Sequence, residues 1–193
     1  DDPFKLAVIN LGSFTNELMT LSPGTEAYVR GPHGNPVEPP KNSRIIAVAG
    51  GTGLAAVYQL ARDFGSTDIY FGARSKDRLY FIKESAEVSN LHVSTNDGSY
   101  GAKGLVTELL EENLKQMSPK ERESLVFYNC GPAPMVKAAE ALQSRYVQPD
   151  RIHNAIDYLT KCGVGICGAC DSPDGRRLCV DGPFLEAADS AKN

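Results

Sequence analysis

The sequence has no stretch of about eighteen consecutive apolar residues, the length that an α-helix needs to cross a membrane. It also has no excess of basic residues, because 20 Lys and Arg stand against 24 Asp and Glu, a net charge of −4. Neither a membrane nor a nucleic acid is therefore expected as a partner. The 193 residues, 41% of them hydrophobic, still predict a globular protein with a real core.

Patterns typical of hydrolases and of histidine metal sites are also missing. His33, His92 and His153 lack the spacing of metal ligands, and no paired carboxylates or Ser/His/Asp set indicates hydrolysis. Cysteine is scarce outside one stretch, since only Cys130 of the five lies outside residues 162–179. A secreted disulfide scaffold would spread its cysteines, whereas a cluster is typical of metal or redox chemistry in a reducing compartment. We therefore expect a cytoplasmic protein.

Residues 1–40 are predicted to be the C-terminal remnant of a β-rich unit. Two strands around a short connection are expected among residues 4–10, 13–21 and 25–31, which is too little for a domain. The connector "GPHGNPVEPPKN", rich in Pro and Gly, then marks a boundary.

Residues 41–150 change to buried strands that alternate with helices. Apolar runs predict strands, and helical periodicity predicts helices between them. The strands are expected at residues 44–50, 67–73, 91–95 and 124–129, and the helices at 54–64, 103–117 and 133–146. This order predicts an α/β fold with a doubly wound parallel sheet to about Tyr146. The segment "VQPDR" is a plausible hinge into a small module at residues 151–193.

The module holds Cys162, Cys167, Cys170 and Cys179 in the spacing C-x4-C-x2-C-x8-C. Three cysteines at C-x4-C-x2-C with a distant fourth are the plant-type 2Fe–2S pattern. Intervening glycines let backbone N–H groups point at the sulfurs. A structural zinc site or two disulfides are the alternatives, although zinc knuckles usually contain C-x2-C twice. The spacing favours a 2Fe–2S cluster.

A glycine loop, "AVAGGTGLAA", lies between the first buried strand and the first helix. Gly51 and Gly53 fit the pattern G-x-G-x-x-A, and the loop of Gly50, Gly51, Thr52 and Gly53 could hold a pyrophosphate at the helix N-terminus. The alternative is a sheet without cofactor whose turn needs glycine for geometry alone. The acid expected for an adenine ribose is absent, and Arg74 stands there instead, so NAD and NADP both remain open.

Two further turns are predicted to lie on the ligand-binding edge of the sheet. "YNCGPAPM" follows a buried strand, so Cys130 and Gly131 could contact a nicotinamide ring, although a lone cysteine is usually only a small apolar residue. "NDGSYGAKG" carries Asp97 and Ser99, which could reach a polar ligand.

Taken together, these motifs resemble one family. A C-G-x-G-x-C-x-x-C…C-x-D-G-P module behind a GG-x-G loop and a C-G-P-x-P-M turn is similar to the electron-transfer subunit of type B dihydroorotate dehydrogenase, within the ferredoxin–NADP reductase superfamily. "VRGPHGN", "DGSYGAKGLVTELL" and "LCVDGPFLE" also resemble that family's segments. The resemblance extends from about Pro23 to Leu185.

The resemblance implies three cofactors and a partner. A 2Fe–2S cluster would be ligated by the four clustered cysteines, NAD(H) would occupy the glycine-loop edge, and FAD would be held by a β-barrel whose arginine-containing strand lies upstream of this sequence. An FMN-containing catalytic subunit would oxidise dihydroorotate and pass electrons through the cluster and FAD to NAD⁺, in pyrimidine biosynthesis. The substrate chemistry, and hence any catalytic residue, would belong to that partner.

Other functions remain open at this point. An electron-transfer subunit of a sulfide dehydrogenase or an NADH–ferredoxin oxidoreductase shares the layout, although some of those relatives carry an aspartate where this chain has Cys162. The alternative from another class is a non-catalytic binding protein with a zinc-filled cysteine loop.

Overall fold

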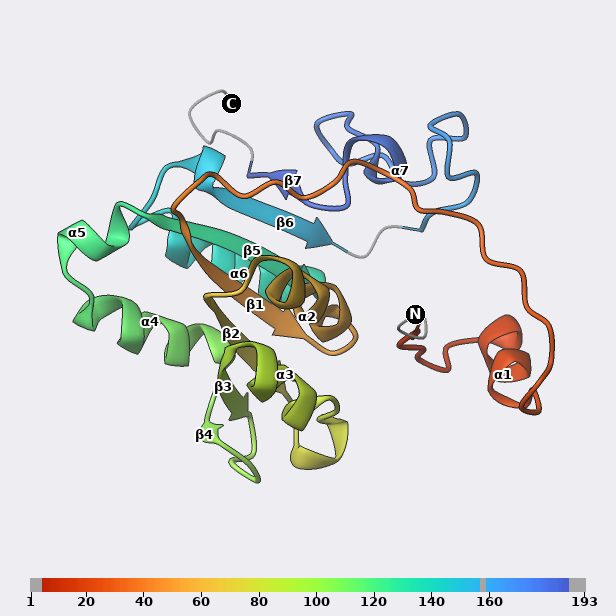
Figure 1. Cartoon of the computed structure of the whole chain (residues 1–193), viewed down its shortest axis with the longest axis horizontal. Helices are drawn as coiled ribbons and strands as arrows, with labels where there is room; N and C mark the ends of the chain where they lie inside the picture. Colours follow the sequence, from red (N-terminus) through yellow and green to blue (C-terminus); the bar gives the residue numbers. More distant parts are fainter. Residues whose placement is uncertain (1–4, 157–158, 188–193) are drawn as a thin grey trace. The chain divides into compact units, whose positions relative to one another are not determined.

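The computed structural model describes residues 5–156 and 159–187 of the chain (Figure 1). It divides into two compact units, Asp1–Pro32 and His33–Asn193. Among residues 5–32 the structure has one helix, α1 (Ser13–Met19), and no strand. The prediction of two strands in this region is therefore wrong. Thr15 explains the helix start, because its Oγ1 accepts the N–H groups of Leu11 and Gly12 at 2.9 and 3.1 Å.

The second unit is built on a seven-stranded sheet in the order β4-β3-β2-β1-β5-β6-β7. All neighbouring strands are parallel except β6 and β7. The strands are β1 (Arg44–Gly50), β2 (Thr67–Ala73), β3 (Asn90–Thr95), β4 (Ala102–Lys103), β5 (Leu125–Gly131), β6 (Ile152–Ile156) and β7 (Leu185–Glu186). The parallel sheet with crossover helices confirms the predicted α/β class.

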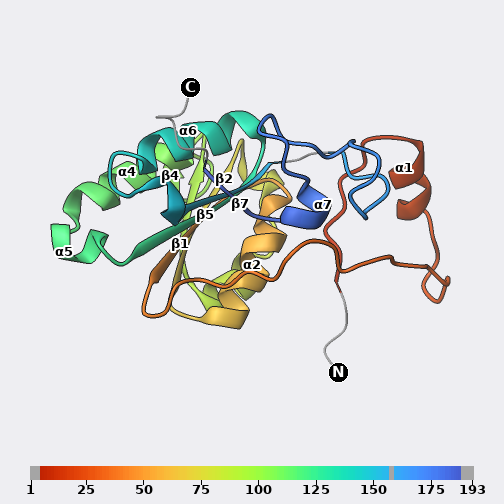
Figure 2. The same cartoon turned by 90° about the horizontal axis from the view of Figure 1, so that it is seen from above.

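Helices cover both faces of the sheet (Figures 1 and 2). On one face lie α2 (Gly53–Phe64) and α3 (Ile82–Val88), and on the other lie α4 (Val106–Gln116) and α6 (Ala133–Gln143). The remaining helical segments are η1 (Lys76–Arg78), α5 (Pro119–Arg122), η2 (Pro149–Arg151) and α7 (Leu178–Asp181). Because successive strand residues point to opposite faces, Ala47 packs on the α2 side while Ile46 and Val48 pack on the α4 and α6 side. These central residues are fully buried.

The apolar runs predicted the central strands and helices well. β1 and β2 occupy the predicted residues, and α2 and α6 begin within one residue of the predicted starts. The sheet continues past residue 150, because β6 and β7 come from the predicted cysteine module. The compact units divide after Pro32, before the predicted boundary at residue 40.

Candidate functional site

The strand order changes direction at β1, because β2 to β4 are added on one side of it and β5 to β7 on the other. Ligands of open parallel sheets bind where the carboxyl ends of the two strands at such a point, here β1 and β5, diverge. The glycine loop follows β1, and Cys130–Gly131 ends β5, so the sheet brings the two predicted nucleotide segments together. Ala49 is the register partner of Cys130 across this pair.

The glycines of the loop have different physical roles. A Cβ at Gly53 would lie 2.1 Å from the carbonyl oxygen of Cys130, so α2 packs directly against the end of β5. A Cβ at Gly50 would likewise lie 2.6 Å from Sδ of Met135. Gly51 has φ +54°, and a Cβ there would meet nothing within 4 Å. Gly53 is therefore required for packing against backbone, Gly50 faces a side chain that can move, and Gly51 is the open backbone position of the loop.

Tyr80 holds the glycine loop, although the sequence offered no local signal for this role. Its hydroxyl donates a hydrogen bond to the Gly51 carbonyl at 3.0 Å. Its ring makes edge contacts with Phe71 and Phe81, at centroid distances of 5.9 and 5.8 Å. Burial raises the pKa of Tyr80 to about 12, so the hydroxyl stays protonated and can donate at neutral pH. Tyr80 thereby fixes the orientation of the peptide between Gly51 and Thr52.

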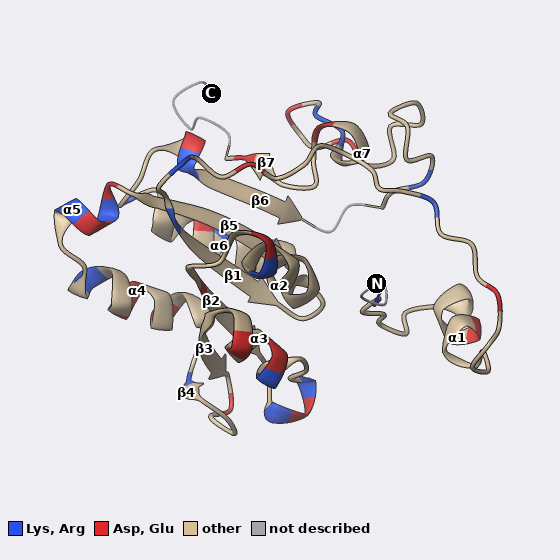
Figure 3. Cartoon of the chain, in the orientation of Figure 1, with Lys and Arg blue, Asp and Glu red and all other residues tan. Residues whose placement is uncertain are grey.

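The turns that follow β2 and β3 are joined to each other. The N–H of Asp97 donates to the Arg74 carbonyl at 3.3 Å, and the N–H of Lys76 donates to Ser99 Oγ at 2.8 Å. Asp97 Oδ1 accepts both the N–H and the hydroxyl of Ser99, which lowers the pKa of this exposed carboxyl. The structure brings Arg74, Asp97 and Ser99 to the same edge, with the last two engaged in holding the turn. Charges of both signs alternate along η1 and α3 (Figure 3).

A buried amide network anchors the end of β5. Asn129 donates to Gln143 on α6 and to Asn154 on β6, each at 2.8 Å, and Gln143 donates back to Asn129 at 2.8 Å. Asn154 in turn donates to Glu140 at 2.6 Å. Since each unmade bond of a buried amide is costly, the satisfied network fixes the strand that leads into Cys130.

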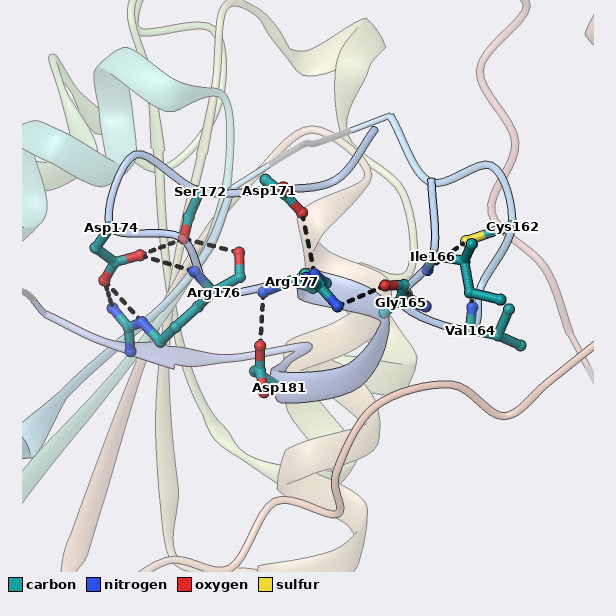
Figure 4. Close-up of polar contacts among 11 residues, drawn as sticks. Cys162, Val164, Gly165, Ile166, Asp171, Ser172, Asp174, Arg176, Arg177 and Asp181 are labelled. Atoms are coloured by element: carbon teal, nitrogen blue, oxygen red, sulfur yellow. Dashed lines mark hydrogen bonds and ion pairs between the residues drawn. The ribbon is translucent and has the colours of Figure 1, made fainter. Parts of the chain in front are cut away.

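Residues 162–182 carry the four clustered cysteines and are called the cysteine loops below. They direct backbone N–H groups at sulfur atoms (Figure 4). Cys162 Sγ accepts from the N–H groups of Val164 and Ile166 at 3.5 and 3.4 Å, and Cys179 Sγ accepts from the N–H of Gly165 at 3.3 Å. Glycines make this path possible, with φ near +70° at positions 163, 165 and 168. The loop that contains the first three cysteines thus wraps toward the fourth.

The environments of the thiols differ. Hydrogen bonds from Val164, Cys167 and Ile166 lower the pKa of Cys162 to about 6, so its thiolate is favoured at neutral pH. Burial and the neighbouring Cys170 thiol raise the pKa of Cys179.

Arg177 links the loop around Gly165 to the segment of Asp171 and Asp181. No local signal in the sequence reveals this role. Its guanidinium donates to the Gly165 carbonyl at 2.5 Å and pairs with Asp171 at 3.7 Å, while its backbone N–H donates to Asp181 at 2.6 Å (Figure 4). The Gly165 carbonyl shares a planar peptide with the N–H of Ile166, which donates to Cys162 Sγ, so Arg177 orients a donor to sulfur.

No three His, Cys, Asp or Glu side chains within residues 5–156 and 159–187 form a ready-made site for a single metal ion. The donor set nevertheless fits a thiolate-ligated cluster, because N–H groups aimed at sulfur stabilise the negative charge that such a cluster carries. All five cysteines lie in the described part of the chain, and none forms a disulfide. Cys130 lies at the end of β5, in the sheet rather than in the cysteine loops.

Comparisons with known proteins agree with both halves of this site. Residues 47–141 match the family described as "Oxidoreductase NAD-binding domain". Residues 159–189 match the "Iron-sulfur cluster binding domain of dihydroorotate dehydrogenase B". The fold and the cysteine loops thus define an NAD-linked oxidoreductase chain with an iron–sulfur module, as the sequence predicted.

The curated relatives narrow this class to one family. The chain is 36% identical over 184 residues to the probable dihydroorotate dehydrogenase B (NAD(+)), electron transfer subunit, of Methanocaldococcus jannaschii, covering 93% of this chain and 68% of the relative. It is 35% identical to the Methanopyrus kandleri protein of the same name, covering 96% and 70%. The chain belongs to the family of dihydroorotate dehydrogenase B electron transfer subunits.

Solved structures extend the likeness to the fold. A chain of an NADH-dependent reduced ferredoxin–NADP oxidoreductase superposes with a TM-score of 0.78 at 30% identity, covering 93% of this chain and 65% of that one. The cytochrome b5 reductase domain of Ulva prolifera nitrate reductase superposes with a TM-score of 0.55 at 18% identity, covering 74% and 64%. The chain therefore spans slightly less than two thirds of each solved chain. In the described residues, no helix is long and apolar enough to cross a membrane.

Proposed function

We propose that this chain is the electron-transfer subunit of a dihydroorotate dehydrogenase complex, with a 2Fe–2S cluster on Cys162, Cys167, Cys170 and Cys179. The observation that carries the proposal is the set of N–H donors aimed at Cys162 and Cys179 from one glycine-rich loop. Membership of the electron-transfer-subunit family supports it. A cytoplasmic location fits the clustered thiols.

Each segment of the chain has a distinct task in this proposal. When bound, nicotinamide exchanges a hydride and a 2Fe–2S cluster a single electron, so a flavin must lie between them. Gly51 offers open backbone to the pyrophosphate of NAD(H), Arg74 lies near the adenosine ribose, and Cys130–Gly131 lies near the nicotinamide. FAD would be the flavin that links the cluster to NAD(H). Dihydroorotate would be oxidised at FMN in a partner subunit.

Iron and acid-labile sulfide analysis tests the cluster. We expect about two of each per chain, as one 2Fe–2S cluster requires. Cys130→Ser should leave the visible spectrum intact, because this cysteine lies in the sheet, whereas Cys167→Ser should bleach it. Stoichiometric zinc without sulfide would reject the assignment and favour a zinc-stabilised binding protein.

The proposed division of labour has its own test. Mixed with NADH in the absence of FAD, the chain should bleach little at the cluster absorbance, whereas with FAD bound it should bleach readily. Dihydroorotate should act only once the FMN-bearing partner is added. Oxidation of dihydroorotate with NAD⁺ by the 193-residue chain alone would refute both points.

The cysteine loop also offers the surface for that partner. Val164 and Ile166 are 58% and 83% exposed beside Cys162. Exposed apolar side chains at the proposed cluster can exclude water and shorten the electron path once the partner covers them. Ile166→Asp should weaken association with the catalytic subunit in a pull-down, while iron content remains that of the parent.

A second function has one observation in its favour. The solved chain with the TM-score of 0.78 belongs to an NADH-dependent reduced ferredoxin–NADP oxidoreductase. If this chain worked in such a complex, reduced ferredoxin rather than dihydroorotate would reduce its cluster. Reduction assays with each donor and its own partner subunit separate the two functions.

A further inference from the structure

The connector that precedes the sheet contacts the cysteine loops far along the sequence. Gly34 has φ +81°, and a Cβ there would lie only 2.2 Å from the Gly182 carbonyl oxygen. The N–H of Asn35 donates to this same carbonyl at 2.6 Å, and the Asn35 side chain reaches the Asp181 carbonyl at 3.5 Å. Gly182 directly follows α7, the helix that carries Cys179. The connector therefore touches the segment of the fourth cysteine backbone to backbone.

His33 makes a second contact, with the loop of the first cysteine. A Cβ at Gly163 would lie 2.6 Å from Cε1 and Nε2 of the His33 ring. The ring thus covers the backbone of Gly163, which follows Cys162 in sequence. Figure 1 shows the connector running beside β7 and α7 on its way to β1. Three consecutive residues contact both ends of the cysteine stretch.

We infer that His33, Gly34 and Asn35 form a brace that holds the loops of Cys162 and Cys179 at a fixed separation. The inference rests on the proposed cluster and adds residues that the cysteine spacing does not reveal. A 2Fe–2S cluster needs its first and last thiolates at set positions, and short loops alone leave that separation free to vary. The brace removes this freedom by packing and by one short backbone hydrogen bond.

Gly34→Ala tests the brace, with Gly175→Ala as the matched control. Both glycines have φ near +80°, so alanine strains the backbone equally at either position. A Cβ at Gly175 meets nothing within 4 Å, although it lies among the cysteine loops, whereas the Cβ at Gly34 must displace Gly182. We expect Gly34→Ala to lose iron to a chelator about tenfold faster than Gly175→Ala. The reason is that the added Cβ at Gly34 forces the backbone at Gly182, next to the helix of Cys179, to shift. Its cluster EPR signal should broaden as well.

His33 supplies a second, milder test that keeps the fold intact. His33→Ala uncovers Gly163 and should accelerate iron loss several-fold, while His33→Phe keeps a flat ring there and should retain the parent rate. Equal iron loss from Gly34→Ala and Gly175→Ala, together with equal loss from His33→Ala and the parent, would overturn the brace. A parent chain without iron and sulfide would instead reject the proposed function itself.

Discussion

Alanine at Gly53 should mainly destabilise the fold, whereas alanine at Gly51 should mainly weaken NADH binding, although the two glycines belong to one sequence motif. A Cβ at Gly53 would lie 2.1 Å from the carbonyl oxygen and 2.5 Å from the carbonyl carbon of Cys130. Both atoms belong to the backbone of a central strand, which cannot move aside as a flexible side chain can. Overpacking of a rigid core costs about 1–3 kcal/mol, and this site should lie at the upper end.

Gly51→Ala introduces strain without a collision. Its φ of +54° costs an alanine about 1–2 kcal/mol, and the added methyl group points into open space. Gly65→Ala is the control, because Gly65 is equally open and ends the same helix α2 that the loop begins, and its φ of +59° with ψ −169° makes alanine at least as costly there. Gly65→Ala should therefore lose at least as much stability as Gly51→Ala, so that lost stability alone cannot explain weaker NADH binding by Gly51→Ala. Only Gly51→Ala should weaken NADH binding, since its methyl group lies where the pyrophosphate would approach.

Thermal unfolding and NADH titration measure the two effects separately. About 3 kcal/mol corresponds to a Tm lowered by roughly 6–12 °C in a chain of this size, which we expect for Gly53→Ala. Gly51→Ala should raise the Kd for NADH about tenfold relative to Gly65→Ala, since blocked backbone cannot donate to phosphate. A parent-like Tm for Gly53→Ala would refute the packing role. Equal NADH affinity of Gly51→Ala and Gly65→Ala would make the loop purely structural.

Other predictions address the residues that hold the site. Tyr80→Phe removes only the hydroxyl on the loop carbonyl, so we expect NADH affinity to fall several-fold while Tm changes by less than about 4 °C, the effect of one ordinary hydrogen bond. Arg177→Ala should speed iron loss to a chelator about fivefold, since its half-exposed guanidinium contributes about 1 kcal/mol. In iron-free protein, iodoacetamide should alkylate Cys162 before Cys179, because the pKa of Cys162 is lowered and that of Cys179 is raised. Mass spectrometry should show that the alkylation rate of Cys162 falls as the pH drops through about 6, where its thiolate becomes protonated.

The central sheet could be predicted because its signal is local. β1 and β2 are continuous apolar runs, and strands buried on both faces need such runs. β6 was missed because its sequence, IHNAI, contains two polar residues. His153 stacks on Tyr128 at 4.8 Å, and Asn154 accepts a hydrogen bond from Asn129. These partners come from another strand, so no local pattern reveals them.

The strands predicted near the N-terminus do not form among residues 5–32, because a strand needs a neighbouring strand as hydrogen-bonding partner. Residues 5–32 contain apolar residues at strand-like spacing, yet no described neighbour pairs with them, and Leu6 and Leu11 remain 63% and 81% exposed. The G-x-G pattern marked the loop correctly but could not distinguish Gly53, which packs, from Gly51, which is open. Tyr80 and Arg177 act on carbonyls that only the folded chain brings near them.

The topology would also bring the proposed nucleotide site and the proposed cluster site near each other. β6 runs parallel to β5, so its carboxyl end lies at the same edge of the sheet as Cys130–Gly131, and Gly131 is the register partner of Ile156. The cysteine loops begin shortly after β6, and β7 brings the chain back to the sheet beside Asn154. The module is therefore attached at both ends to β6, the strand that borders the Cys130–Gly131 turn. A substitution that removes the Asn129–Asn154 hydrogen bond would loosen β6. It should therefore disturb the proposed nucleotide site and the proposed cluster site at once.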